Sequence, residues 1–262
     1  MFLVFLALRT LVTYHDSNFV VLKKNLISQP SHLKSQISNL MNNKHQVHNL
    51  IILDESGSME SIKNNVLQGF NEIVQTIKGI EKEFPDQEHF ISMISFNGLG
   101  QKLLHFVDPA SKLDQLNDTN YNPGASTPLY DAMGFGINKL KQYLAPLTDY
   151  NVLVTIFTDG EENASREFSG EAIKALVEEL KLKNWTFTYI GTDHDVTALA
   201  DKLSINNTMF FNKNQDDIDR MFLKERSARV NYSNRLSMKM NVSEGFYDDE
   251  LIIKPNNPED SK

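Results

Sequence analysis

The stretch Leu50-Ile51-Ile52-Leu53 leads directly into Asp54-Glu55-Ser56-Gly57-Ser58, and it decides how the rest of the chain is interpreted. An uninterrupted apolar run bounded by polar residues is typical of a β-strand buried on both faces. The pentad that follows places one carboxylate and two hydroxyls at alternate positions in the turn leaving that strand. Oxygen ligands of this kind suit a hard divalent cation. A simpler interpretation is that Asp54, Ser56 and Ser58 turn the chain and cap the next helix.

The composition limits the classes of protein to consider. The chain has 262 residues, 40% of them hydrophobic and 23% charged, which is ordinary for one large or two small globular domains. A net charge of -8 argues against nucleic acid as a main partner, because phosphate binding needs a basic surface. The absence of cysteine excludes disulfides, thiolate zinc sites and a cysteine nucleophile. It also fits a reducing compartment, so we expect a cytoplasmic protein.

The two ends of the sequence lack the periodic pattern of the middle. Residues 1–40 are expected to be a dispensable extension. The apolar segment from Phe2 to Leu8 is interrupted by Arg9 and is too short for a stable membrane span. It also lacks the basic start and cleavage site of a signal peptide, although export or anchoring through this segment stays as the alternative. Residues 231–262 are polar and contain Asn and Pro, so we expect a disordered tail.

Between residues 41 and 230, strand patterns alternate with helical ones. Apolar residues recur at helical spacing over 62–80, 129–144 and 173–180, and strand-like runs occupy 50–53, 90–96, 102–107, 152–157, 185–190 and 208–211. Asn97-Gly98 between two such runs indicates a hairpin. The alternation predicts an α/β fold, a doubly wound, three-layer arrangement with a mostly parallel sheet and one antiparallel strand.

Two further oxygen-bearing positions follow strands of this sheet. Asp159 comes just after the strand-like run 152–157, and Thr127 lies in the loop Pro123-Gly124-Ala125-Ser126-Thr127-Pro128. Each has a simpler interpretation, Asp159 as a turn residue in Asp-Gly and Thr127 as a helix N-cap before Pro128. However, ligands of open α/β sheets bind at the carboxyl ends of the strands, where the strand order reverses. If the two strands are neighbours there, Asp54 and Asp159 converge.

Asp54-x-Ser56-x-Ser58, Thr127 and Asp159 together resemble the metal-ion-dependent adhesion site of von Willebrand factor A domains. The resemblance extends from about Val47 to Val230, and Thr127-Pro128-Leu129-Tyr130-Asp131-Ala132 is similar to the second loop of bacterial members. Ala125-Ser126 departs from the pattern, since many relatives carry glycines there, but no ligand is lost.

The resemblance implies a Rossmann-like sheet of six strands, five parallel and one antiparallel, with one Mg²⁺ at its edge. Mn²⁺ or Ca²⁺ are alternatives with the same preference for oxygen. In the family, two serines bind the metal directly, and the corresponding residues here are Ser56 and Ser58. Thr127, Asp54 and Asp159 would bind directly or through water. The expected function is a protein–protein interaction module in which an Asp or Glu of the partner binds the metal.

The alternative function is a metal-dependent phosphoryl-transfer hydrolase that uses Asp54 as its nucleophile. Hydrolases of the haloacid-dehalogenase type need a second carboxylate two residues later, and that position is Ser56. The sequence also contains no Gly-x-x-x-x-Gly-Lys-Ser/Thr loop for a nucleotide phosphate. We therefore expect that the protein is not an enzyme.

Overall fold

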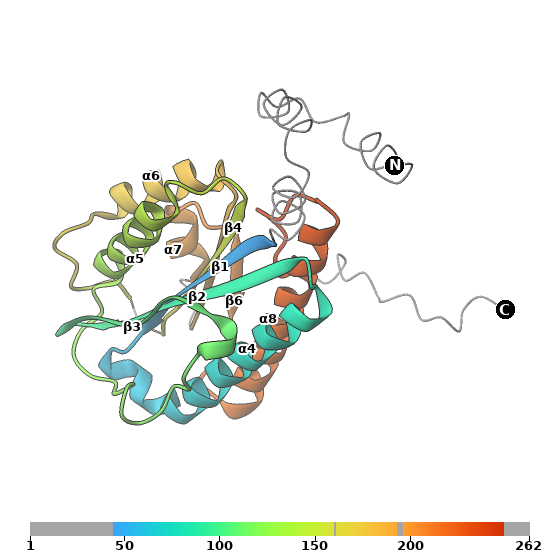
Figure 1. Ribbon diagram of the computed structural model, residues 1–262. Helices are drawn as coiled ribbons and strands as arrows, with labels where there is room; N and C mark the ends of the chain where they lie inside the picture. The colour runs from blue at the N-terminus through green and yellow to red at the C-terminus, as the bar shows by residue number, and fades with distance from the viewer. Residues whose placement is uncertain (1–43, 160, 193–195, 249–262) are drawn as a thin grey trace, which may run out of the picture. The chain divides into compact units, whose positions relative to one another are not determined.

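The computed structural model describes residues 44–159, 161–192 and 196–248, so the extension expected at 1–40 lies outside the described residues. A six-stranded sheet has the order β3-β2-β1-β4-β5-β6 (Figure 1). Its strands are β1 (His45–Asp54), β2 (Gln87–Asn97), β3 (Gly100–Pro109), β4 (Tyr150–Phe157), β5 (Trp185–Gly191) and β6 (Asn207–Phe210). Only the β2–β3 pair is antiparallel among these strands. The predicted fold class is confirmed, including the hairpin after Asn97.

Helices cover both faces of the sheet (Figure 1). They are α4 (Lys63–Glu83), α5 (Leu129–Leu144), α6 (Gly170–Lys181), α7 (Val196–Lys202) and α8 (Gln215–Ser237), with short 3₁₀ segments η1 (Gly57–Ile62) and η2 (Ala110–Lys112). Side chains of α4 and α8 belong to one buried cluster, and those of α5, α6 and α7 belong to another. The sheet separates the two clusters, which gives the three layers that the alternating sequence predicts.

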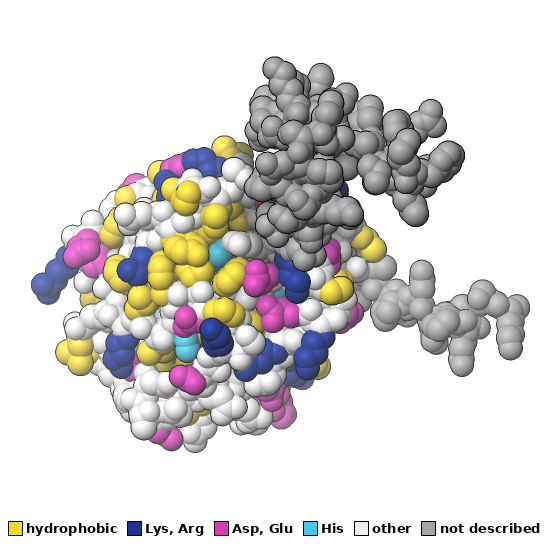
Figure 2. Space-filling view, in the orientation of Figure 1, with side chains coloured by type: hydrophobic (Ala, Val, Ile, Leu, Met, Phe, Trp, Pro, Cys, Tyr) yellow, Lys and Arg dark blue, Asp and Glu magenta, His cyan; other side chains and the backbone are white. Residues whose placement is uncertain are grey.

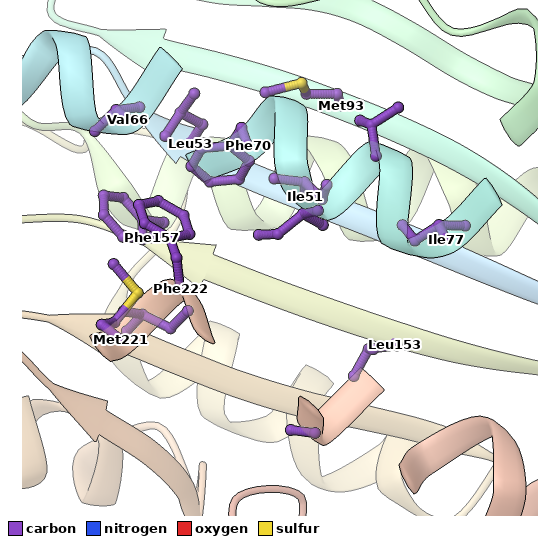
Figure 3. Close-up of a cluster of buried hydrophobic side chains, with 14 of the residues drawn as sticks. Ile51, Leu53, Val66, Phe70, Ile77, Met93, Leu153, Phe157, Met221 and Phe222 are labelled. Carbon is purple, nitrogen blue, oxygen red and sulfur yellow. The ribbon is translucent and has the colours of Figure 1, made fainter. Parts of the chain in front are cut away.

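Strand β1 supplies side chains to both clusters because successive residues of a strand point to opposite faces. Ile51 and Leu53 pack in the α4/α8 cluster, and Leu50 and Ile52 pack in the other. Figure 3 shows the first of these clusters, in which side chains from β1, β2, β4, α4 and α8 meet. This double burial explains the four consecutive apolar residues that precede the pentad.

The last helix extends beyond the end predicted from the sequence. We expected a polar, disordered tail from residue 231, but α8 continues to Ser237. Val242 and Phe246 are buried in the α4/α8 cluster. The expectation is therefore corrected for residues 231–248, and residues 249–262 lie outside the described part of the chain.

The order of the strands shows where in the sheet a ligand site is expected. β1 is hydrogen-bonded in parallel to β2 on one side and to β4 on the other, with Leu53 opposite Phe157. The chain leaves β1 toward β2 and later returns to the other side as β4, so the strand order reverses between β1 and β4. This is the place where ligands bind in open α/β sheets. Asp54 and Asp159 both lie there, at the carboxyl ends of adjacent strands.

Candidate metal centre

Asp54 is the last residue of β1, and its side chain is completely buried. Its Oδ1 accepts a hydrogen bond from the Ser56 backbone N–H at 2.7 Å, and its Oδ2 accepts one from the Thr158 hydroxyl at 2.6 Å. The first bond folds the pentad back over the strand end. The second ties β1 to the end of β4, so Asp54 is held from both strands.

Asp159 and the two serines form a continuous group of side-chain oxygens. The Ser56 and Ser58 Oγ atoms are 3.1 Å apart, and the Ser58 hydroxyl donates to Oδ1 of Asp159 at 2.6 Å. The Ser58 and Asp159 positions are 101 residues apart in the sequence. The fold therefore brings the pentad after β1 into direct contact with Asp159 after β4.

The loop that carries Thr127 is fastened against the pentad by the backbone. Gly57 N donates to Ala125 O at 3.0 Å, and Gly124 N donates to Glu55 O at 2.9 Å. Thr127 is buried, and its backbone N–H donates to Asn163 Oδ1 at 2.9 Å. The structure thus places the segment that contains Thr127 beside the serines.

The simpler capping interpretations do not describe these hydroxyls. Ser56 precedes η1, but its side chain makes no cap hydrogen bond. α5 begins at Leu129 with Pro128 as its N-cap residue, so Thr127 does not cap it. Ser56 and Thr127 are therefore placed at this sheet edge without being used to terminate a helix.

Ala125 occupies a loop position where many relatives carry glycine, and its backbone adopts a conformation that glycine favours. Its φ angle of 64° lies in the left-handed region that favours glycine. The bond from Gly57 N to the Ala125 carbonyl holds this conformation. The loop that carries Thr127 therefore has a left-handed residue at Ala125 even though Ala125 has a side chain.

The electrostatics of the site favour a cation. Burial, assisted to a lesser degree by the nearby charge of Asp159, raises the pKa of Asp54 to about 6 in spite of the Thr158 and Ser56 hydrogen bonds. Asp159 Oδ2 is also buried, and an ammonium group, that of Lys213, lies 2.6 Å from it. Two carboxylates and neighbouring hydroxyls are ligands that Mg²⁺ accepts, so the residues present fit a divalent cation. No group of three or more His, Cys, Asp or Glu side chains that could hold a metal occurs among the described residues.

Sequence reasoning missed several residues that support this edge. Glu55 is buried, and its Oε1 accepts from Lys102 Nζ at 2.6 Å and from the Asn122 backbone N–H at 2.5 Å. Thr158 donates to Asp54, and Lys213 forms an ion pair with Asp159 Oδ2 at 2.6 Å. Thr158 adjoins a predicted ligand and could have been noticed. Lys102 and Lys213 are ordinary lysines far away in sequence, and nothing in the local pattern indicates them.

A cavity of about 360 Å³ lies beside Asp159. Residues of α5, β5 and α7 and of the loops after β4 and β5 line it, among them Tyr130, Glu161, Tyr189, Thr192 and Lys202. The lining is mixed, with carboxylates, hydroxyls and a lysine at one place. This cavity gives the sheet edge a recess next to the candidate ligand Asp159.

Sequence comparison matches residues 50–224, more than half of the chain, to the von Willebrand factor type A domain. The chain therefore belongs to this family, whose members are protein-interaction modules. No protein with a curated description matches the sequence.

Three solved structures are similar to this chain. A von Willebrand factor type A protein from Catenulispora acidiphila is 12% identical, with 72% of this chain and 43% of that chain covered and a TM-score of 0.49. Proximal thread matrix protein 1 from the mussel byssus is 14% identical, with coverage of 69% and 45% and a TM-score of 0.45. The pilus adhesin SpaC from Lactobacillus rhamnosus GG is 14% identical, with coverage of 72% and 30% and a TM-score of 0.51. The chain spans less than half the length of each of these proteins.

Proposed function

We propose that the protein binds a divalent cation, with Mg²⁺ as the first candidate, and uses it to bind an acidic side chain of a protein partner. The observation that supports this most directly is the contact of Ser58 with both Ser56 and Asp159, at 3.1 and 2.6 Å. It joins the two ends of the predicted ligand set at the edge of the sheet where ligands bind.

Five side chains would hold the ion: Asp54, Ser56, Ser58, Thr127 and Asp159. The two carboxylates balance the charge of a divalent cation, and the hydroxyls add neutral ligands. When bound, the cation would offer a coordination position to an Asp or Glu of the partner. The hydrogen bonds from Ser56 N and Thr158 to Asp54 orient that carboxylate before any ion arrives.

Surface charge agrees with a protein partner rather than a nucleic acid. Acidic and basic side chains are interspersed on the face shown in Figure 2, and the chain as a whole carries a net charge of -8. Within the described residues, no helix is both long enough and apolar enough to cross a membrane.

Calorimetry with Mg²⁺ and Mn²⁺ tests metal binding. The wild type is expected to bind one ion, and Asp54→Ala is expected to lose binding because a charged ligand is removed. Glu161→Ala is the matched control, since it removes an exposed carboxylate that lines the cavity beside Asp159 but is not a proposed ligand. Absence of binding by the wild type, or equal binding by wild type and Asp54→Ala, would contradict the proposal.

The second half of the proposal is tested with the partner. The proteins retained by the immobilised wild type in Mg²⁺ are compared with those that it retains in EDTA. They are also compared with the proteins retained by immobilised Asp159→Ala in Mg²⁺. The proposed function requires a protein that is retained only by the wild type with metal, and whose retention is lost when its own acidic residue is replaced by an amide. Retention that is indifferent to EDTA would contradict a metal bridge.

We also propose that the chain does not catalyse phosphoryl transfer, because Ser56 occupies the position where the hydrolase needs its second carboxylate. Hydrolysis of p-nitrophenyl phosphate in Mg²⁺ should not exceed the rate of the Asp54→Ala variant. A rate that falls with Asp54→Ala and survives Ser58→Ala would support the enzyme instead.

A further inference from the structure

Lys213 places a positive charge on the candidate metal ligand Asp159. Its Nζ is 2.6 Å from Asp159 Oδ2, and the other carboxylate oxygen accepts the Ser58 hydroxyl. The Asp159 side chain is fully buried, whereas 34% of the Lys213 side chain remains exposed. Both oxygens of this carboxylate therefore already have partners from the chain itself.

The loop that carries Lys213 is fixed on both sides of it. Phe211 N donates to Gly191 O at 3.1 Å, which attaches the end of β6 to β5. On the other side, Asn214 Oδ1 caps α8 by accepting from Asp217 N at 3.0 Å. The Asn212 and Asn214 side-chain amides also both donate to Asp217. The Lys213 backbone is thus held beside Asp159 by contacts that do not involve its own side chain.

The position of this lysine has a direct electrostatic consequence. A buried carboxylate needs a counter-charge, and Lys213 supplies one without any metal. A divalent cation at Asp159 would meet an ammonium group of the same sign, at a place where burial weakens screening by water. The ion must therefore displace the ammonium or tolerate its repulsion.

We propose that Lys213 is a built-in competitor for the cation at Asp159 and that it sets the metal affinity of the site. This inference rests on the proposed metal-binding function. It assigns to Lys213 a role that none of the five ligands has, because Lys213 acts against the ion rather than for it.

Calorimetric titration of the full chain with Mg²⁺ tests the role of Lys213. Lys213→Met keeps the length of the side chain but removes its charge, and it should bind Mg²⁺ about tenfold more tightly than the wild type. Lys213→Arg retains the charge and should stay near the wild-type affinity. Lys202→Met is the matched control, because Lys202 is an exposed lysine that lines the cavity beside Asp159. Its loss should change the affinity much less.

The outcomes separate this inference from the proposed function. Equal or weaker Mg²⁺ binding by Lys213→Met, with the wild type still binding, would overturn only the role of Lys213. An equal gain in Lys202→Met would also overturn it, since general charge would then explain the effect. If neither the wild type nor Lys213→Met binds Mg²⁺, the metal site itself is rejected.

Thermal unfolding gives a readout that does not depend on calorimetric heats. Without metal, Lys213→Met should unfold at a lower temperature because the buried Asp159 charge has lost its counter-charge. Added Mg²⁺ should raise the unfolding temperature of Lys213→Met by more than that of the wild type, since a tighter ligand stabilises the folded state more. An equal or smaller rise would contradict competition at Asp159.

Discussion

The candidate metal centre and the polar network beneath α8 both bury charge, but they balance it differently. At the metal centre, Asp54 and Asp159 bring two carboxylates together, and Lys213 is the cation that contacts one of them. Beneath α8, Glu225 and Arg229 are both buried and form an ion pair at 2.8 Å. The metal centre has an excess of negative charge, whereas the network beneath α8 has one negative and one positive charge.

The network under α8 also satisfies its hydrogen bonds. Arg229 donates to Glu225 at 2.9 Å, to Asn49 on β1 at 2.9 Å and to Thr155 on β4 at 2.6 Å. The Tyr247 hydroxyl donates to the second oxygen of Glu225 at 2.6 Å. A buried polar network of this kind is complete in itself and fixes a helix on a sheet. Buried charge therefore indicates a ligand only where the protein leaves that charge incompletely compensated.

Arg229→Met should have the largest effect on stability. Removing the cation leaves Glu225 buried without a counter-charge, which should cost about 3–5 kcal/mol of the free energy of unfolding. Urea unfolding followed by circular dichroism measures this loss. Lys141→Met is the control, because it breaks the more exposed ion pair with Glu179 and should cost less than about 1 kcal/mol.

A double variant tests the reason for that loss. If Arg229→Met destabilises through the uncompensated carboxylate, adding Glu225→Gln should restore part of the stability. A loss of equal size with and without Glu225→Gln would show that the packing of Arg229, and not its charge, matters.

The same two regions show what the sequence can and cannot predict. The apolar strand before Asp54 and the spacing of the oxygen residues predicted the sheet and the approach of Asp54 to Asp159. The continuation of α8 past residue 230 was missed because its buried residues there are Tyr232, Ser233 and Arg235, which do not form an apolar helical pattern in the sequence. Lys213 was missed because its contact with Asp159 depends on the tertiary arrangement of the β6–α8 loop.

His89 extends the comparison to pH, because it lies beside the network under α8. Burial, with a smaller contribution from the Arg229 charge, lowers the pKa of His89 to about 3. Its unfolded pKa is about 6.5, so between these values the unfolded chain binds a proton that the folded chain does not. Stability is therefore full above pH 6.5 and falls as the pH decreases toward 3. His89→Gln should remove about 2 kcal/mol of the loss between pH 7 and pH 5.

Urea unfolding of both proteins at the two pH values measures this difference. The comparison of wild type with His89→Gln isolates one proton from the other groups that titrate in this range. If His89→Gln loses as much stability on acidification as the wild type, the folded protein must accept the proton on His89. The network under α8 would then tolerate a second positive charge beside Arg229.

Asp54→Asn should give the smallest change and the opposite sign. In EDTA at pH 7.5 the ionised Asp54 is buried next to Asp159, so removing its charge should stabilise the fold by about 1 kcal/mol. Burial raises the pKa of Asp54 to about 6, whereas an unfolded Asp titrates at about 3.9, so the cost of its charge builds up between these pH values and is complete above pH 6. The gain should therefore be smaller at pH 5 and should vanish only below about pH 4, where the folded and the unfolded chain both hold the proton.

Asp131→Asn is the matched control for the stabilisation expected from Asp54→Asn. Asp131 is also a buried carboxylate, but its oxygens accept the backbone N–H groups of Arg166, Glu167 and Phe168 at 2.8–2.9 Å. The same substitution there loses acceptor capacity and should destabilise the protein by about 1–2 kcal/mol. Equal losses in Asp54→Asn and Asp131→Asn would mean that Asp54 is as well compensated as Asp131. The sheet edge would then lack the excess of negative charge on which a cation site depends.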